Sequence, residues 1–285
     1  MSWEKLIKEN KPLVVAGTIN AYSALLAERA GIKAIYLSGG GVANASYGLP
    51  DLAMTSREDV LEDVRRIRSA SELPLLVDID TGWGSALAIS RSIKEMISAG
   101  ASGVHIEDQV SEKRCGHRPN KEIVSCEEMV DRIKAAKDAQ TDDNFLLMAR
   151  TDAFAKGGLQ EVIDRSNAFI EAGAGAIFPE AISTLKDYEE ISKNVSKPIL
   201  ANITEFGMTP LFSHNELADA GVKIILHPLS AFRAMSKAAE KVYATLASGG
   251  DHEGLLDKMQ TRDELYDVLD YHMYEEKIDK LFEKN

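Results

Sequence analysis

The stretch LLVDIDTGWGSALAISRSIKEMISAGASGVHIED (75–108) decides the fold. It contains two apolar runs, LLVDID (75–80) and GVHIED (103–108), with a helical segment between them that ends in Ala-Gly. Nearly continuous apolar character is typical of strands that are buried on both faces of a parallel sheet. A glycine at the end of a helix, followed by a strand, is the turn chemistry of a β/α unit. The stretch therefore predicts two parallel strands joined by a helix over 85–100.

The same alternation continues in both directions along the chain. Six further apolar runs are predicted to be strands: LVVAGTI (13–19), AIYLS (34–38), FLLMAR (145–150), GAIFPE (175–180), PILANI (198–203) and VKIILHP (222–228). Three further helices are predicted over 56–70, 125–140 and 158–173. Eight β/α units in about 240 residues predict an α/β protein with a (β/α)8 barrel. A doubly wound open sheet is the alternative, but the chain has neither a GxGxxG motif after the first strand nor a GxxxxGK[ST] motif.

The region from about residue 253 to residue 285 is helical, charged and free of predicted strands. It is too short to form a domain of its own. We therefore expect a single barrel domain over 1–285 with a C-terminal helical extension, which packs on the barrel or on another subunit.

Composition narrows the class of protein. The 285 residues include 33 Lys and Arg and 45 Asp and Glu, which gives a formal net charge of −12 and no obvious basic face for nucleic acid. No apolar run approaches the ~18 residues of a membrane helix, and the first residues lack the layout of a signal peptide. Two cysteines, Cys115 and Cys126, are too few for a disulfide framework. We expect a cytoplasmic protein that binds neither nucleic acid nor membranes.

Polar side chains stand where the predicted strands end, which is where barrels place their active sites. Asp78 and Asp80 are two residues apart, so both point to the same side of an extended strand. Together with Glu107 at the next strand end, they predict a site for a hard divalent ion, Mg²⁺ or Mn²⁺, although ion pairs or strand-end caps would use the same residues. Arg150 and Arg233 suit carboxylate recognition, and a structural ion pair is the alternative for Arg150.

The segment SEKRCGHRPNKEIVS (111–125) follows the fourth predicted strand and is basic within an acidic protein. Neighbouring cations lower the pKa of a thiol, so Cys115 is a candidate nucleophile or general acid. An exposed basic loop with an incidental cysteine is the alternative. Cys126 stands at a predicted helix start outside this cluster and is expected to be structural; activation by its position at the helix N-terminus is the alternative. His105 lies inside a predicted strand and is expected to be a core histidine.

The motifs VDIDTGWG (77–84), VHIEDQ (104–109) and KRCGH (113–117) resemble those of the isocitrate lyase / phosphoenolpyruvate mutase superfamily. The resemblance runs from about residue 4 to the C-terminus through further motifs: YLSGGGVA (36–43), ARTDA (149–153), IFPEA (177–181), LANITEFG (200–207), PLSAFRAM (228–235) and LYDVLDYHMYEEK (265–277). KRCGH with these flanks is specific for carbon–carbon lyases of the superfamily. Phosphonate-forming members lack the cysteine loop, so a mutase is disfavoured.

The resemblance implies roles for residues of this chain. Asp78 and Asp80 match metal ligands, and Asp51 and Glu107 match acids around the metal's water molecules. Cys115 matches the catalytic acid/base, with His117 and Arg150 beside it. Positions that contact substrate are matched by Ser38, Gly39, Gly40, Cys115, Gly116, Arg150, Glu180, Asn202, Ile203, Thr204, Arg233 and Arg262. An apolar wall for a methyl group is matched by Phe178, Leu226 and Pro228. His227 is a departure, because members of this kind often carry Tyr there.

The implied activity is Mg²⁺-dependent cleavage of (2S,3R)-2-methylisocitrate, a tricarboxylate, into pyruvate and succinate, as in the methylcitrate cycle of propionate catabolism. Tyr36 is a candidate for removing the hydroxyl proton. Related members also imply a homotetramer, a dimer of dimers whose last helix swaps between subunits. Lyases for 2,3-dimethylmalate and hydrolases for oxaloacetate are alternatives in the same superfamily. A non-catalytic barrel that binds a dicarboxylate is the alternative from another class.

Overall fold

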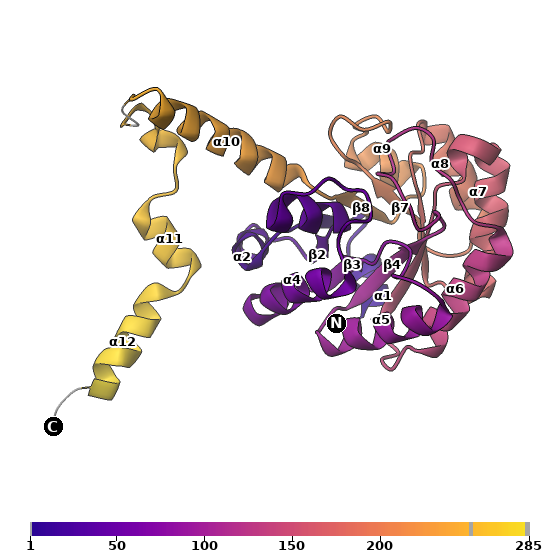
Figure 1. Ribbon diagram of the computed structural model, residues 1–285, viewed down its shortest axis with the longest axis horizontal. Coiled ribbons are helices and arrows are strands. Elements are labelled where there is room, and N and C mark those ends of the chain that lie inside the picture. Colours follow the sequence, from indigo (N-terminus) through magenta and orange to yellow (C-terminus); the bar gives the residue numbers. More distant parts are fainter. Residues whose placement is uncertain (1, 251–252, 283–285) are drawn as a thin grey trace. The chain divides into compact units, whose positions relative to one another are not determined.

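The computed structural model describes residues 2–250 and 253–282 (Figure 1). The chain divides into two compact units, one that extends to Phe232 and one that begins at Arg233. The first unit holds all eight strands of the sheet, whereas the second is helical. Residues 283–285 of the expected C-terminal extension lie outside the described residues.

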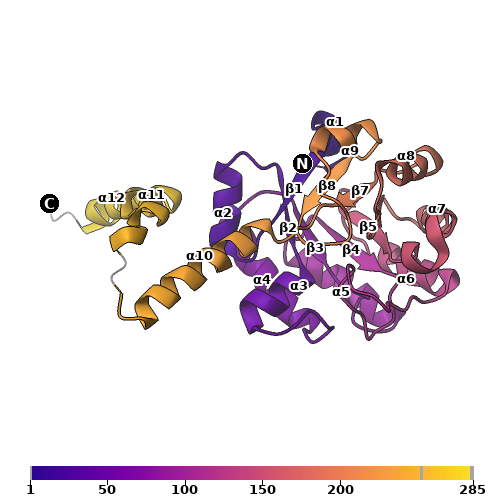
Figure 2. The same ribbon diagram turned by 90° about the horizontal axis from the view of Figure 1, so that it is seen from above.

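Eight parallel strands form the centre of the first unit (Figure 2). Their bounds are β1 (Leu13–Gly17), β2 (Ala34–Leu37), β3 (Leu75–Asp78), β4 (Gly103–Glu107), β5 (Leu146–Thr151), β6 (Ala176–Pro179), β7 (Leu200–Asn202) and β8 (Ile224–His227). All eight predicted strands are present; seven are trimmed at one or both ends, and β5 begins and ends one residue later than predicted. Asp80 and Asp108 therefore lie just beyond their strands, where the backbone has turned into the loops.

The strands follow one another in sequence order around the sheet, and β8 pairs with β1. A parallel bridge between Ile177 and Ile199 joins β6 to β7, so the sheet is a nearly closed barrel. This order confirms the predicted (β/α)8 architecture. It excludes the doubly wound alternative, because an open sheet would reverse its strand order at a switch point.

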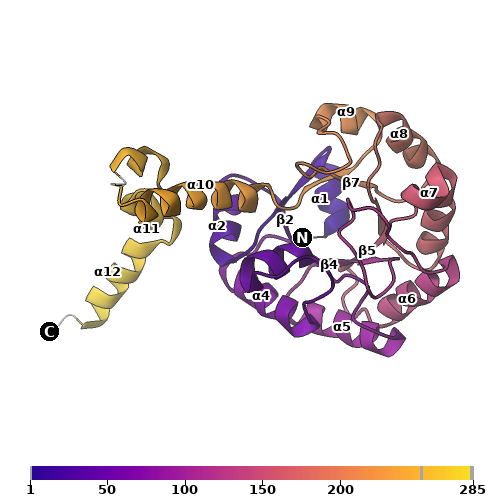
Figure 3. The same cartoon turned by 45° about the horizontal axis from the view of Figure 1, so that its top comes forward.

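Helices surround the barrel as an outer ring (Figure 3). The helical elements of the first unit are α1 (Trp3–Glu9), α2 (Ala21–Arg29), α3 (Gly39–Gly41), η1 (Val42–Ser46), α4 (Arg57–Ala70), α5 (Ala86–Ser98), α6 (Cys126–Asp138), α7 (Phe154–Glu171), α8 (Leu185–Asn194) and α9 (His214–Asp219). Helix α4 begins after Ser56, whose hydroxyl accepts from the Asp59 N–H while Asp59 bonds back to Ser56. Helix α7 starts earlier than predicted and is interrupted at Gly158, which has φ of 70°.

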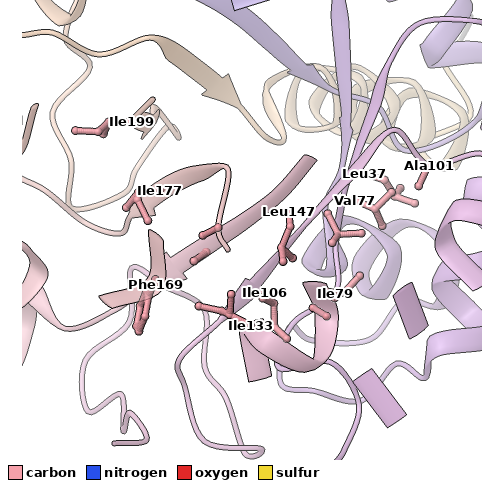
Figure 4. Packing of buried hydrophobic residues seen from close by; sticks show 14 of the residues in the cluster. Leu37, Val77, Ile79, Ala101, Ile106, Ile133, Leu147, Phe169, Ile177 and Ile199 are labelled. Atoms are coloured by element: carbon pink, nitrogen blue, oxygen red, sulfur yellow. The ribbon is translucent and has the colours of Figure 1, made fainter. Parts of the chain in front are cut away.

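Two apolar layers hold the barrel together. One lies between strands and helices, where Ile133 and Phe169 of the helices pack with strand residues such as Val77 and Leu147 (Figure 4). The other fills the barrel interior and includes Trp3, whose indole N–H donates to the Ser102 carbonyl at 2.9 Å. Because Trp3 packs with residues at the beginnings of strands, α1 plugs the amino-terminal end of the barrel. The opposite end is left for the polar strand ends.

The second unit contains most of α10 (Ser230–Ala247), followed by η2 (Glu253–Lys258), α11 (Arg262–Val268) and α12 (Tyr271–Phe282). Thr261 caps α11, and the rings of Tyr266 and Tyr271 stack with centroids 4.2 Å apart. Helices α10 and α12 have no buried residues. None of the described helices combines the length and the apolar character that crossing a membrane requires.

Candidate active site

Three buried carboxylates converge at the carboxyl ends of neighbouring strands. Asp78 ends β3, Asp80 follows it, and Glu107 ends β4; one carboxylate oxygen from each lies within 4.8 Å of the others. The backbone N–H of Gly39 donates to Asp78 Oδ2 at 3.0 Å. A Cβ at Gly39 would lie 3.2 Å from both Asp78 Oδ2 and Asp80 Oδ1, so a side chain would crowd this cluster. The three predicted acids thus form one constellation.

The donor set fits a hard divalent cation, because three buried anionic oxygens need positive charge between them. Lys113 supplies part of that charge. Its Nζ lies 2.7 Å from Asp80 Oδ1 and 2.5 Å from Asp51 Oδ1. Asp51 therefore stands beside the triad and contacts it through Lys113. Mg²⁺ usually binds one or two carboxylates directly and keeps several water molecules. The cluster has enough carboxylates for some to bind the ion and for the others to accept hydrogen bonds from its waters.

Ionisation differs among the three carboxyl groups. Burial opposes ionisation of Asp78, but the charges of His105, Lys113 and Arg150 outweigh it and lower its pKa to about 2. Burial raises the pKa of Asp80 to about 6, with Asp78 adding to the rise and Lys113 opposing it. Burial also raises the pKa of Glu107 well above its usual range. The site is thus poised to bind one further cation, which would stabilise all three charges.

Arg150 lies at the end of β5 and is held by carboxylates on three sides. Its guanidinium contacts Glu107 at 3.2 Å, Asp152 at 2.9 Å and Glu180 at 3.2 Å, and it lies 5.2 Å from the Phe178 ring centroid. These are the ion pairs that the sequence offered as an alternative to ligand binding. Because they orient the guanidinium rigidly at the barrel mouth, they leave it positioned to meet an anion.

The loop that carries KRCGH folds over this mouth. A Cβ at Gly116 would lie 2.4 Å from Arg150 Nη2 and from Glu180 Oε2, so only glycine fits here. His117 Nε2 lies 3.3 Å from Glu180 Oε1, and its Nδ1 accepts from the Met208 N–H at 3.0 Å. The backbone of the loop thus packs directly on the arginine–glutamate pair. An incidental exposed loop would not be built in this way.

Lysines of the loop are buried, which sequence reasoning missed. Lys113 is 5% exposed and Lys121 is 6% exposed. Lys121 pairs with Asp152 and donates to the Gly116 carbonyl at 2.5 Å. A run of basic residues in a loop is usually exposed to solvent. The carboxylates that pair with these two lysines come from other segments of the chain and are brought to them only by the fold.

The protonation of Cys115 differs from the sequence-based expectation. Burial raises the pKa of its thiol, although the backbone N–H of His117 favours the thiolate. The expected lowering is wrong, because burial disfavours the thiolate and the charges of Asp51 and Glu180 oppose the lowering by Arg150. A thiol that keeps its proton near neutral pH suits the role of proton donor.

Two aromatic side chains extend the site inward from the triad. The Tyr36 hydroxyl lies 2.9 Å from His105 Nε2 and 3.3 Å from Asp78 Oδ2. Burial, with Asp78 next in importance, raises the pKa of Tyr36 well above its usual range, and burial lowers that of His105 to about 4. Tyr36 therefore keeps its proton, which suits donation better than the proton removal expected from the sequence. His105 is buried as predicted, yet it contacts site residues. It pairs in register with Asp78 on the neighbouring strand β3, so the strand pairing would have indicated that it lies at the site.

Other predicted site residues fall in different places. Asn202 Nδ2 lies 3.3 Å from His117 Nε2, and its Oδ1 is buried without a hydrogen bond among the described residues. Ser38 caps α3 by accepting from the Gly41 N–H. Further positions at the mouth are Gly40, against Asp51, and Thr204, against Gly207. Buried apolar positions are Phe178 and Leu226 in the barrel interior and Ile203 in the outer layer. Pro228 lies against Gly17, whereas Arg233 and Arg262 belong to the second unit.

The fold and this constellation define a class: a barrel protein whose mouth carries an acid triad that could hold a divalent cation, an arginine paired with carboxylates and a cysteine loop. The family model for phosphoenolpyruvate phosphomutase matches residues 3–247. The chain belongs to this family, which confirms the superfamily expected from the motifs.

Curated relatives match over almost the whole chain. A 2-methylisocitrate lyase of Vibrio cholerae is 59% identical over 97% of this chain and 92% of its own length. A 2-methylisocitrate lyase of Shewanella oneidensis is 57% identical over 100% of this chain and 98% of its own length.

Solved structures of the superfamily share the architecture. A 2,3-dimethylmalate lyase is 31% identical, with a TM-score of 0.84 over 97% of this chain and 93% of that chain. A phosphonopyruvate hydrolase in complex with oxalate and Mg²⁺ is 28% identical, with a TM-score of 0.85 over 98% of this chain and 97% of that chain. The first is named a lyase and the second a hydrolase, so the shared barrel supports more than one reaction.

Proposed function

We propose that this chain is a carbon–carbon lyase that cleaves (2S,3R)-2-methylisocitrate into pyruvate and succinate. The observation that carries the proposal is the KRCGH loop: Lys113 reaches the acid triad while Gly116 packs on the Arg150–Glu180 pair. One loop thereby joins a cation site, an anion site and a proton donor. The curated relatives at 57–59% identity bear the name of this activity.

The proposed cofactor is Mg²⁺, with Mn²⁺ as a substitute. Asp78 and Asp80 would hold the ion directly or through water, and Glu107 and Asp51 would accept from its waters. The ion's charge would lower the pKa of the substrate hydroxyl. The related phosphonopyruvate hydrolase complex contains Mg²⁺, which supports this choice.

The chain's own residues carry the proposed bond cleavage. Once the substrate hydroxyl has given its proton to water, the bond between C2 and C3 breaks, C2 becomes the carbonyl carbon of pyruvate, and C3 keeps the electron pair. Arg150 and His117 stabilise the charge that spreads into the neighbouring carboxylate. Cys115 then donates its thiol proton to C3, which gives succinate, and regains a proton from solvent.

Substrate recognition is proposed to use carboxylate-binding and methyl-binding positions. The contacts would come from Ser38, Gly39, Gly40, Cys115, Gly116, Arg150, Glu180, Asn202, Ile203 and Thr204. Arg233 and Arg262 are proposed as further contacts on the resemblance alone. Phe178, Leu226 and Pro228 would accept the methyl group. One buried methyl contributes only about 1–3 kcal/mol of discrimination, so isocitrate is expected to be a slow substrate.

We further propose a cytoplasmic homotetramer, a dimer of dimers, that acts in propionate catabolism through the methylcitrate cycle. The support is the exposed apolar surface of α10 and α12, with Tyr243 71%, Leu281 69% and Phe282 77% exposed. Such side chains gain stability when another subunit covers them. The extension from about residue 253 to 285 would swap between paired subunits around a single barrel domain. Light scattering coupled to size exclusion measures the subunit number, and a monomer would contradict the assembly.

The decisive test follows pyruvate by a coupled dehydrogenase while the protein acts on racemic 2-methylisocitrate with Mg²⁺. Isocitrate, 2,3-dimethylmalate and oxaloacetate are assayed in parallel, with EDTA as control. Metal-dependent pyruvate release far above glyoxylate release from isocitrate is expected. Faster turnover of 2,3-dimethylmalate or oxaloacetate would replace the proposed substrate. Inactivity of folded, metal-loaded protein on all four acids would favour a dicarboxylate-binding barrel.

A further inference from the structure

Two histidines face each other near the carboxyl end of β8. His214 is the first residue of α9, and His227 is the last residue of β8. Their Nε2 atoms lie 3.0 Å apart, and their ring centroids lie 5.3 Å apart with the planes at 45°. His214 is exposed and His227 is half-buried, so the pair is open to solvent on one side. The proposed reaction assigns no step to either ring.

The separation of the two nitrogens is that of two ligands on one ion. Imidazole nitrogens lie about 2.0–2.1 Å from Zn²⁺, so two of them at a bond angle of about 90–110° are roughly 2.9–3.4 Å apart. The observed 3.0 Å falls in this range. A direct hydrogen bond between the rings fits the same distance, but it needs one ring to carry its proton on Nε2 and the other to leave Nε2 bare.

The surroundings of the pair favour a cation. Burial, and then the neighbouring His214, lower the pKa of His227, and the charge of the Glu205 carboxylate only partly opposes this fall. His227 is therefore neutral at pH 7, as a metal ligand must be. Glu205 Oε1 accepts from the Ser230 hydroxyl at 2.5 Å, while its Oε2 is buried without a hydrogen bond among the described residues. A buried carboxylate oxygen that has no hydrogen bond among the described residues thus lies close enough to His227 for its charge to act on that ring.

We propose that His214 and His227 together bind one divalent transition-metal ion of the class of Zn²⁺, Ni²⁺ or Co²⁺, with water completing the coordination and Glu205 balancing the charge. This site is separate from the acid triad in residues and in chemistry. Imidazole ligands select borderline transition metals, whereas the carboxylates of the triad suit Mg²⁺. A saturating concentration of Mg²⁺ therefore leaves the histidine site free.

A bound ion would act on the loop between β7 and α9. This loop, residues 203–213, donates the Met208 N–H to His117 and ends at Ser213, the cap of α9. An ion shared by His214 and His227 would fasten the end of the loop to β8. The loop that orients His117 would then have less freedom, so occupancy of the site is expected to change turnover as well as stability.

The test is calorimetric titration of the full chain with Ni²⁺ in excess Mg²⁺ at pH 7.5. The unsubstituted protein, His214→Gln, His227→Gln and the double variant are compared, with His272→Gln as the matched control. His272 is an exposed histidine beside Glu275 in the second unit. We expect one Ni²⁺ per chain and a loss of affinity of at least tenfold in each single variant. The double variant is expected to lose little more, since one imidazole alone cannot chelate, and the control is expected to be unchanged.

Two results would overturn the proposal. Equal Ni²⁺ affinity in the unsubstituted protein and the double variant would leave the pair as a hydrogen bond, and loss in only one single variant would exclude a shared ion. Co²⁺ provides an independent measurement, because a sulfur-to-cobalt charge-transfer band would place the ion on a cysteine instead. A weak visible band without that feature, lost in both single variants, is the expected spectrum. Thermal melts of all variants confirm that each is folded.

Discussion

Cys115 combines exposure to the barrel mouth with a thiol that holds its proton. Burial raises its pKa, and the charges of Asp51 and Glu180 add to the rise while Arg150 opposes it. Cys126 also has a raised pKa through burial, but it stands at the start of α6, away from the loop motif. The two thiols therefore form a natural pair of test and control.

We predict that Cys115→Ser retains substrate and Mg²⁺ binding but loses turnover by about 10²–10⁴-fold, the usual contribution of a general acid. A serine hydroxyl is nearly the same size as a thiol but a much weaker acid. Calorimetric binding and the pyruvate assay measure the two properties separately. Cys126→Ser is the matched control and should keep full turnover. Undiminished turnover in Cys115→Ser would remove the cysteine from the mechanism.

The pH dependence of alkylation follows from the same pKa shift. A thiol reacts with iodoacetamide as its thiolate, so a raised pKa means less thiolate at any pH below that pKa. We predict that Cys115 in the folded protein reaches half its maximal alkylation rate at a higher pH than the same cysteine in urea. Mass spectrometry of peptides containing Cys115 and Cys126 resolves the two rates. A folded-state profile shifted to lower pH would mean that the loop cations do act on the thiol.

At the scale of elements, the loop between β4 and α6 is held in position by the contact of the Gly116 backbone with two buried side chains. Gly116 lies so close to Arg150 and Glu180 that a Cβ would be 2.4 Å from each. Those two side chains are buried in an ion-pair network and cannot swing aside. A methyl group at this position must therefore displace the loop itself.

We predict that Gly116→Ala lowers kcat/KM by at least tenfold, because a displaced loop moves Cys115 and His117 together. Overpacking costs typically about 1–3 kcal/mol, so the fold should survive, as a thermal melt would verify. Gly254→Ala is the matched control, since nothing lies within 4 Å of its added Cβ. If both variants had the same kcat/KM, the contact with Arg150 and Glu180 would have no role in catalysis.

For the whole molecule, the acid triad links cation binding to stability. Three buried carboxylates lie within 4.8 Å of one another, and burial, with the charge of Asp78 adding to it, raises the pKa of Asp80 to about 6. An ion that binds only the folded chain stabilises it by about 2.7 kcal/mol at 100 times its Kd. The barrel as a whole should therefore melt at a higher temperature when Mg²⁺ is present.

We predict that saturating Mg²⁺ raises Tm by several degrees and that EDTA reverses the rise. Asp80→Asn should abolish the shift while keeping the metal-free protein folded, because it removes one of the repelling charges. Asp279→Asn, in an exposed helix of the second unit, is the control and should keep the shift. Scanning calorimetry with Mg²⁺ and with EDTA measures the shift in Tm for the unsubstituted protein and for the two variants. An undiminished shift in Asp80→Asn would place the ion elsewhere.

Much of the site could be located from the sequence, because the barrel topology determines where the residues at the strand ends lie. Once the apolar runs are recognised as parallel strands, residues at their carboxyl ends must meet at one mouth. Asp78, Glu107 and Arg150 were found in this way, and the structure brings them together. Asp80 also lies at the mouth, because β3 ends at Asp78, two residues before it. The helical unit that holds Arg233 and Arg262 offers no such rule, so their roles stay proposals.

The sequence by itself determined the eight strands and the acids at their ends and favoured the barrel over an open sheet, because these depend on local apolar runs and on the number of β/α units. Only the tertiary structure decided the charge state of the site. Burial of Lys113 against Asp51 and Asp80 depends on residues that are 62 and 33 positions away along the chain meeting it in space. The same holds for the pairing of His214 with His227. The charge state of a group depends on its burial and on the charged groups near it, and the order of residues in the sequence shows neither.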